Sequence, residues 1–337
     1  MEIKNKANIL FIYKDFSTFV RSDYENLSQF YSVKLFKSNL GKSFFQFIIP
    51  LIHQFFFLLF HIHKFDVVFC WFADYHSFLP LFFVKLFGKK SYLVLGGYDV
   101  QYIPELKYGS FSNPLRSFCS RYSIENCTYN LAVSDNLIND AKKRTKKGKF
   151  ILLPTGYNPD SFVFGHEKEN IVLTVSITST YQRYMVKGLD RFVELARICP
   201  DFQFIIIGIE PKTKTFFEPV PTNLKLIGSV KPDELKLWYK KSAFYAQFSR
   251  SEGLPNSICE AMLSGCIPIG VNSGGISYAM GEQGILIDEW DKHIMKNLLM
   301  QTKWNQSKGF AARESIINRF HIDLRKDFLS NLINPLK

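Results

Sequence analysis

Two carboxylates stand eight positions apart where the chain passes from a strand-like run into a helix-like one. Glu252 and Glu260 belong to residues 249–275, which read Ser-Arg-Ser-Glu-Gly-Leu-Pro-Asn-Ser-Ile-Cys-Glu-Ala-Met-Leu-Ser-Gly-Cys-Ile-Pro-Ile-Gly-Val-Asn-Ser-Gly-Gly. On one straight helix they would be about 12 Å apart, whereas a glycosidase carboxylate pair is about 5 to 9.5 Å apart. We therefore expect Glu252 to lie near a reacting group and Glu260 near the hydroxyls of a nucleotide.

The segments around these glutamates suit a phosphate-binding unit. The apolar run 243–248 predicts a buried parallel strand, Gly253 and Asn256 interrupt regular structure, and a helix-forming run starts at Ser257. Asn256 or Ser257 is the expected N-cap, and the first N–H groups of such a helix attract an anion. Residues 267–271 predict the next buried strand.

The rest of the chain alternates between strand-like and helix-like segments. Apolar runs occur at 9–13, 33–36, 66–70, 92–95, 131–133 and 150–153, then at 171–175, 204–208 and 224–228. Helices are expected from about Gly188 and from Pro232. This βα alternation predicts doubly wound parallel sheets, and 337 residues suit two α/β domains of about 150 residues each. We expect domains at 1–164 and 165–319.

Composition narrows the classes of partner. The formal charge of +12 favours anionic partners, but no nucleic-acid-reading module is visible. Six cysteines are scattered without a Cys-x-x-Cys pair, which favours a reduced, cytoplasmic setting and argues against a metal site. Residues 1–8 lead directly into a strand-like run, so no secretion signal is expected.

The stretch 249–275 resembles the Glu-x7-Glu signature of family 4 of the retaining, nucleotide-sugar-dependent glycosyltransferases. Other matches agree in order and spacing: Val133-Ser134 with residues 154–158, Lys187-Gly188, Gly208, and Gly228-Ser229-Val230. The resemblance implies the GT-B fold, in which two Rossmann-like doubly wound domains face across a cleft. It also implies that the C-terminal helix, expected within about 320–337, crosses back to the first domain.

The resemblance assigns a donor site to the second domain. Breaking a sugar–diphosphate bond needs fixed positive charge, and Lys187 fits that role, although a solvated lysine is the alternative. Glu252 would contact the transferred sugar and Glu260 the ribose, where a surface glutamate is the alternative. The remaining donor-binding candidates are Gly228, Val230, Gly253, Asn256 and Ser257, for which ordinary capping and core packing are alternatives. The family's arginine before the lysine is missing, and Arg183 could replace it or be an exposed loop residue.

Acceptor-side candidates lie in the first domain. Gly97 and Asp99 follow the strand-like run 92–95 and resemble the family's G-x-D-V segment, so Asp99 could orient the acceptor or assist its proton. An Asx-type turn is the competing explanation. His76 is a second candidate in a loop, with a helix-start histidine as the alternative. Residues 14–17, Lys-Asp-Phe-Ser, replace the family's glycine-rich loop.

Two segments indicate a membrane surface. Residues 44–62 are nearly all apolar, but Pro50 and polar side chains interrupt them, so an interfacial helix and a buried Rossmann helix are both open. Lys142, Lys143, Arg144, Lys146, Lys147 and Lys149 form a basic run that is either a solvated helix end or a contact for anionic lipid.

These patterns predict a metal-independent retaining glycosyltransferase, of hexosyltransferase type, without a cofactor. Its donor would be a UDP- or GDP-sugar, and its acceptor a glycolipid or a polysaccharide precursor, as in the biosynthesis of polysaccharide or lipopolysaccharide. We expect it in the cytoplasm, in peripheral contact with the inner face of the cell membrane. A sugar-nucleotide epimerase on the same fold and a catalytically silent nucleotide-sugar-binding protein are the alternatives.

Overall fold

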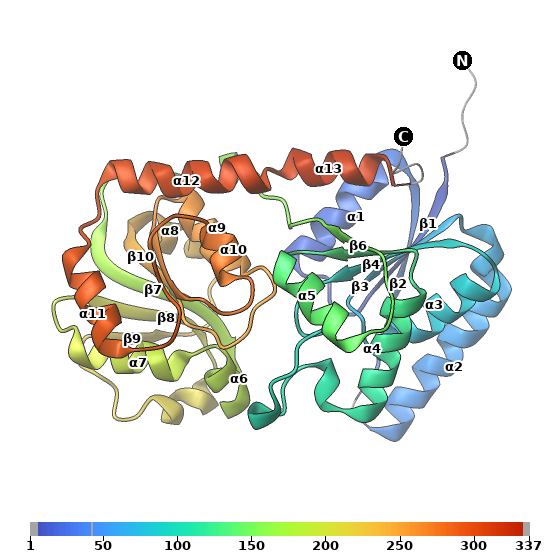
Figure 1. The fold of residues 1–337 in the computed structure, drawn as a ribbon, viewed down its shortest axis with the longest axis horizontal. Coiled ribbons are helices and arrows are strands. Elements are labelled where there is room, and N and C mark those ends of the chain that lie inside the picture. The colour runs from blue at the N-terminus through green and yellow to red at the C-terminus, as the bar shows by residue number, and fades with distance from the viewer. Residues whose placement is uncertain (1–5, 42, 333–337) are drawn as a thin grey trace, which may run out of the picture. The chain divides into compact units, whose positions relative to one another are not determined.

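The computed structural model describes residues 6–41 and 43–332 of the chain. The chain forms two compact units, which are drawn in Figure 1. Unit 1 comprises residues up to Gly156 together with those from Ile322 onward, and unit 2 comprises Tyr157–His321. The domain limits 1–164, with the C-terminal helix at about 320–337, and 165–319 stay a prediction.

Within the described residues, unit 1 contains a six-stranded parallel sheet with the order β2-β1-β3-β4-β5-β6. Its strands are β1 (Asn8–Tyr13), β2 (Ser32–Lys37), β3 (Val67–Trp71), β4 (Lys90–Leu95), β5 (Tyr129–Ala132) and β6 (Phe150–Leu152). Its helices are α1 (Thr18–Phe30), α2 (Phe44–His61), α3 (Tyr75–Leu86), α4 (Pro114–Asn126), α5 (Asp135–Arg144) and α13 (Ile322–Ser330). The central strands are buried on both faces, which explains their continuous apolar runs.

Unit 2, all of whose residues are described, contains a second six-stranded parallel sheet with the order β12-β11-β10-β7-β8-β9. Its strands are β7 (Glu169–Thr178), β8 (Gln203–Ile209), β9 (Leu224–Ile227), β10 (Ser242–Gln247), β11 (Ile267–Val271) and β12 (Ile285–Ile287). Its helices are α6 (Tyr181–Val186), α7 (Leu189–Ile198), α8 (Pro232–Lys241), α9 (Asn256–Leu263), α10 (Ile276–Met280), α11 (Lys292–Gln301) and α12 (Gln306–Phe320). One apolar core links β7, β8, β10 and β11 with α7 and α11.

The two-domain α/β fold class is confirmed. Every strand expected from an apolar run is present, and the order of each sheet places strands far apart in sequence side by side. The short strand β12 was not predicted, because a run of three residues is too brief to show a pattern. Helix α6 was also not predicted, and it separates β7 from the helix expected at Gly188.

The C-terminal helix returns to unit 1, as expected. Helix α13 packs against α1, where Arg325 donates to both carboxylate oxygens of Asp23 at 2.6 and 2.7 Å. Arg325 also donates to the carbonyls of Leu153 and Pro154, and Asp23 accepts from the indole of Trp71 at 2.9 Å. Because both charged side chains are buried, this network fixes α13 to the first sheet. Residues 333–336, the end of the expected helix, lie outside the described residues.

Helix α2 is continuous despite Pro50, and most of its apolar side chains are uncovered. Only Gln54 and Leu58 are buried, whereas Phe44 and Phe45 are each 71% exposed. Residues 44–64 are long and apolar enough to cross a membrane by length and composition alone. Because most of its apolar side chains are exposed, this segment is not a buried Rossmann helix. Its contact with a membrane stays a prediction.

Candidate active site

Lys187 and Glu252, which are 65 positions apart in sequence, form the centre of the candidate donor site. The Lys187 ammonium lies 2.6 Å from Glu252 Oε1, and the two side chains are 24% and 12% exposed. Ser249 Oγ and Gln247 Nε2 donate to the same oxygen at 2.7 and 3.0 Å. In the described part of the chain all three side-chain hydrogen bonds reach Oε1, which leaves Oε2 available to a ligand hydroxyl.

A close contact between the backbones of Gly188 and Phe248 positions Lys187. Lys187 directly follows α6, and Gly188, which precedes α7, has a left-handed conformation with a φ of +63°. A Cβ on Gly188 would lie 2.0 Å from the carbonyl oxygen of Phe248, which directly follows β10. The glycine after Lys187 therefore lets the lysine segment approach the strand that leads to Glu252.

Replacing Gly188 by alanine should reduce the free energy of unfolding by roughly 2 kcal/mol. An alanine is strained in the left-handed backbone conformation, and its Cβ would clash with the carbonyl oxygen of Phe248. Gly228→Ala is the matched control, since its Cβ would meet nothing nearer than Ile209 O at 3.9 Å. Urea unfolding followed by circular dichroism measures both. Equal stability of the two variants would show that the contact at Gly188 does not matter.

The loop that carries Glu252 is held from two sides. Arg250 forms two hydrogen bonds with the carboxylate of Asp190 at 2.8 and 2.6 Å, which ties the loop to α7. Gly275 donates its backbone N–H to Glu252 O at 3.1 Å. Gly274 has a φ of +56°, and it lies so close to the Glu252 backbone that a Cβ would be 2.4 Å from Glu252 O. The two glycines that close the 249–275 stretch thus support the glutamate that opens it.

Glu260 lies on α9 and is half-buried. Tyr239 Oη donates to Glu260 Oε2 at 3.1 Å. Burial raises the pKa of Glu260 to about 7, and the hydrogen bond from Tyr239 opposes that rise. The surface-glutamate alternative does not fit this environment. A carboxyl held this way near neutral pH can accept hydroxyl hydrogen bonds when it is ionised.

The expected cap of α9 was wrong. The helix begins at Asn256 and its N-cap is Pro255, without a side-chain cap hydrogen bond. Asn256 is not the cap because its side chain serves another partner: Tyr157 Oη donates to Asn256 Oδ1 at 2.5 Å. Gly253 precedes the helix and is buried, and Ser257 lies in its first turn and is half-buried. Both residues therefore lie near the positive end of the helix.

The other donor-side candidates lie at carboxyl ends of unit 2's strands. Gly228 is exposed after β9, and its carbonyl accepts from Gly208 N–H at 3.2 Å. Val230 is half-buried, so it is not a core valine.

Arg183 lies on α6 rather than in a loop, and its side chain is exposed. The structure records no ion pair for Arg183 within the described residues, and its substitution for the missing arginine stays a prediction.

In unit 1, Asp99 joins the ends of two strands. Its buried carboxylate accepts from the N–H groups of Gly97 at 2.7 Å, Gly96 at 3.2 Å and Ala73 at 3.3 Å. Burial raises the pKa of Asp99 to about 6, while these backbone hydrogen bonds lower it. Gly97 has a φ of +134°, which suits the turn. These contacts fit the Asx-type alternative, and a direct role toward an acceptor stays a prediction.

His76 lies within α3, not in a loop. It is 2% exposed, and its Nε2 donates to the carbonyl of Trp71 at 2.8 Å. Burial lowers the pKa of His76, which favours the neutral ring. The helix-start explanation therefore describes its position.

A pocket of about 480 Å³ with a mixed polar and apolar lining lies at the carboxyl edge of unit 1's sheet and was not predicted. We call it the edge pocket. Its charged and polar lining includes Lys14, Ser38, Asp74, His76 and Arg116. Arg116 Nε lies 2.9 Å from Asp74 Oδ1, while Lys14 is exposed. Sequence reasoning missed Arg116 because its partners are distant in sequence, although Asn113-Pro114 was a readable helix start.

Comparison with known proteins adds a family and a fold. Residues 171–301 match the family described as Glycosyl transferases group 1. No curated protein matches the chain. The sucrose-phosphate synthase of Thermosynechococcus elongatus superposes with a TM-score of 0.79 at 15% identity, covering 97% of this chain and 98% of that one.

Two further solved structures share the architecture. Anabaena HepE, in complex with UDP and glucose, has a TM-score of 0.73 at 13% identity and covers 98% of this chain and 100% of its own. A glycosyltransferase from Rickettsia africae has a TM-score of 0.69 at 15% identity, with 98% and 99% covered. The chain has the GT-B fold. Together with the family match over most of unit 2, this fold supports a glycosyltransferase.

Proposed function

We propose that the protein is a retaining glycosyltransferase of family 4 and of hexosyltransferase type. It moves a sugar from a nucleotide-diphosphate sugar to a glycolipid or polysaccharide precursor without a metal ion. The observation that carries this proposal is the 2.6 Å pair of Lys187 and Glu252, which lies with Glu260 inside the family-matched segment. The domain of residues 165–319 would hold the donor, and that of residues 1–164 with the C-terminal helix would hold the acceptor.

The contacts of the site support a division of roles. Lys187 supplies positive charge to the departing diphosphate, and the first N–H groups of α9 add to it. Glu252 is fixed through Oε1 and presents Oε2 to the hydroxyls of the transferred sugar. Glu260 receives the ribose hydroxyls. The leaving diphosphate assists deprotonation of the acceptor on the same face of the sugar, since the loop offers no obvious side-chain nucleophile.

The pKa of Glu260 leads to a pH dependence of nucleotide binding. Its pKa of about 7 means that the carboxyl is mostly protonated at pH 6 and mostly ionised at pH 8. The ionised form accepts hydroxyl hydrogen bonds better, so binding should weaken about tenfold as pH falls across this interval. Calorimetric titration with UDP, GDP and ADP measures it. The Glu260→Gln variant should lack this component, and identical pH profiles of the two proteins would overturn the assignment.

The donor base is proposed to be uracil or guanine. The complex of HepE with UDP and glucose favours UDP among these, because the two proteins share the GT-B fold. The epimerase alternative predicts an altered sugar nucleotide without any acceptor, and a silent binding protein predicts nucleotide binding without turnover. We retain both as outcomes of the test.

We propose that the protein acts at the inner face of the cell membrane. The uncovered apolar side chains of α2 support this location, and so does the basic run at the end of α5, in which Lys142, Lys143, Lys146, Lys147 and Lys149 are exposed. Apolar side chains can enter the interface while lysines pair with anionic lipid.

The test is a thermal-shift screen of UDP-, GDP- and ADP-sugars, followed by mass analysis of products with candidate glycolipid and glycan acceptors. We expect one class of donor to raise the melting temperature and to yield a product heavier by one sugar. A new sugar nucleotide in the absence of acceptor would establish the epimerase, and stabilisation without turnover would establish the silent binding protein.

A further inference from the structure

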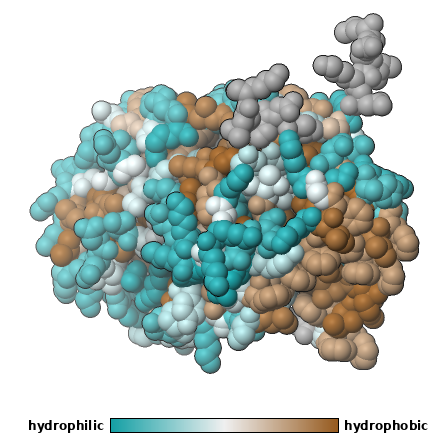
Figure 2. All heavy atoms as spheres, turned by 45° about the vertical axis from the view of Figure 1, so that its right-hand side comes forward, coloured by the Kyte–Doolittle hydropathy of each residue, from teal (hydrophilic) through white to brown (hydrophobic). Residues whose placement is uncertain are grey.

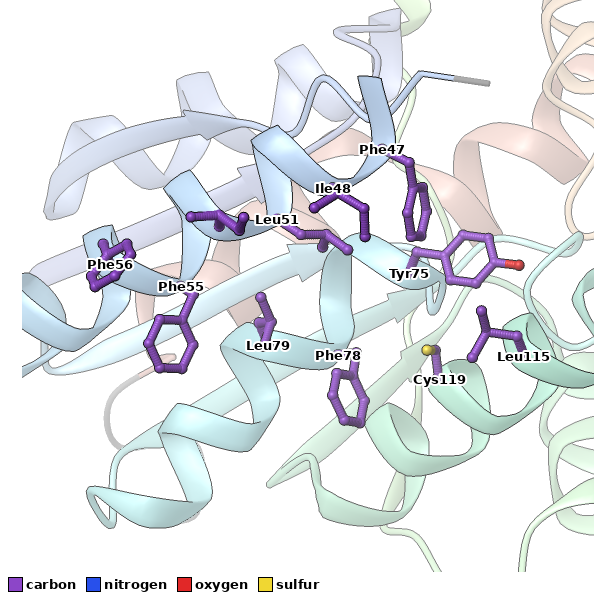
Figure 3. A pocket seen from close by; sticks show the side chains of 11 residues that line it. Phe47, Ile48, Leu51, Phe55, Phe56, Tyr75, Phe78, Leu79, Leu115 and Cys119 are labelled. Carbon is purple, nitrogen blue, oxygen red and sulfur yellow. The ribbon is translucent and has the colours of Figure 1, made fainter. Parts of the chain in front are cut away.

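An apolar groove of about 390 Å³ runs between three helices of unit 1 (Figure 3). Helix α2 lines one side, and α3 and α4 line the other. The lining side chains are Phe47, Ile48, Leu51, Ile52, Phe55, Phe56, Tyr75, Phe78, Leu79, Leu115 and Cys119. On α2 they recur with the spacing of successive helical turns, and in Figure 3 Phe47 and Phe55 point from α2 toward α3.

The groove is held open rather than filled by the fold. Gln54 on α2 donates through Nε2 to the carbonyl of His76 at 3.0 Å, and this buried hydrogen bond fixes α2 to α3. The groove side of α2 nevertheless stays uncovered, with Ile52 51% and Phe56 50% exposed. An apolar ligand that covered these side chains would gain binding free energy of about 25 cal/mol for each Å² of apolar surface removed from water.

The groove is continuous with the edge pocket. Phe47, Tyr75 and Leu115 line both cavities, so the apolar groove opens into a pocket that also has charged and polar side chains in its lining. The described lining of the edge pocket includes Lys14 and the ion pair of Arg116 with Asp74 at 2.9 Å, and burial lowers the pKa of His76. Helix α2 also begins at this pocket, so its positive end adds to the charge of Lys14, whereas Asp74 already caps α3. The edge pocket therefore suits an anionic head group.

The outer surface gives the same molecule a route from a bilayer. Beyond the groove, Phe45, Ile49 and Phe60 on α2 and Leu86 on α3 are 62 to 71% exposed. Figure 2 shows hydrophobic side chains gathered over one part of the surface. Residues 44–62 contain no acidic side chain, so nothing there repels an anionic lipid.

We propose that the groove binds the hydrocarbon chain of a lipid phosphate, whose head group enters the edge pocket beside Lys14 and Arg116. The shared residues place the boundary between chain and head group near Tyr75. An acceptor role for this lipid rests on the proposed glycosyl transfer, whereas its binding does not.

The test uses the full chain and a hexadecyl phosphate that carries a diazirine on its alkyl chain. Leu115→Glu places a charge where the two cavities meet, and Phe118→Glu is its matched control, because the two side chains are 58% and 56% exposed on the same helix but only Leu115 lines the groove. Ile52→Glu and Phe60→Glu make a second pair on α2. Photolabelling and fluorescence titration measure binding, and thermal melting confirms that each variant is folded.

We expect saturable labelling of α2, α3 and α4 that falls at least about tenfold in Leu115→Glu and Ile52→Glu, but not in Phe118→Glu and Phe60→Glu. Equal losses in all four variants would show non-specific adsorption and overturn the groove. Wild type should also bind hexadecyl phosphate more tightly than hexadecanol, and Lys14→Gln should remove that difference. No difference in wild type would overturn the head-group assignment.

Binding and transfer separate the two proposals. Lipid binding is measured without a nucleotide sugar, so a protein that binds lipid but transfers no sugar keeps the groove and loses the proposed function. A protein that transfers sugar but shows no saturable labelling keeps the function and loses the groove.

Discussion

Replacing Glu252 by glutamine, or Lys187 by methionine, should lower kcat/KM for sugar transfer by at least about 100-fold. The reason is electrostatic: in the proposed donor site, each change removes a charge where charge would develop as the sugar–diphosphate bond breaks. The Lys187 ammonium and Glu252 Oε1 are 2.6 Å apart, so each change also leaves the remaining charged group without its partner. Initial rates with the donor identified by the screen measure the effect.

The control for this prediction is Glu169→Gln, a charge change on the edge of the same unit, where the carboxylate is 3.9 Å from Lys241 and both side chains are exposed. That variant should keep full activity, because exposed pairs of this kind contribute little. Thermal melting of the two site variants should shift by only a few degrees, since Glu252→Gln keeps a hydrogen-bonding oxygen. Full activity in either site variant would reject the assignment of the pair.

The second large effect concerns stability. Replacing Arg325 by methionine should reduce the free energy of unfolding by about 3 to 5 kcal/mol, because it leaves the buried carboxylate of Asp23 without its cation. The two groups are 3% and 1% exposed, and Arg325 also donates to the carbonyls of Leu153 and Pro154. Urea unfolding followed by circular dichroism and tryptophan fluorescence measures the loss.

Two further variants separate charge from packing. Lys326→Met, on the same helix but half-buried, should change stability by less than about 0.5 kcal/mol. The double variant Asp23→Asn with Arg325→Met should be more stable than Arg325→Met alone, because it removes the uncompensated charge and keeps an acceptor for Trp71. If the double variant were the least stable of the three, the buried ion pair would not be the cause.

The sequence predicted what depends on neighbours in the chain. The strand before Glu252, the loop and the helix that carries Glu260 are contiguous, so their order and polarity were readable. Apolar runs predicted the strands of both sheets because a strand covered on both faces must be apolar throughout. Helix α6 could have been found from Thr180, whose hydroxyl caps Arg183 N–H at 3.2 Å, but its aromatic residues obscured the signal.

What depends on distant residues was not predicted. Asn256 failed as a cap because Tyr157, 99 positions away, uses its side chain. The edge pocket combines Lys14, Asp74 and Arg116 from three separate segments, and no local pattern joins them. Tyr239, the hydrogen-bond partner of Glu260, was not predicted, because it is 21 positions away and no local pattern joins the two side chains.

The most direct test of glycosyl transfer is a mass balance with stereochemistry. Purified protein, the stabilising nucleotide sugar and the accepted glycolipid or glycan are incubated without a metal ion, and proton NMR follows the anomeric signals. We predict one nucleoside diphosphate released for each glycosylated acceptor, with the anomeric configuration of the donor kept in the product. An inverted product, or a sugar nucleotide altered without transfer, would contradict this account.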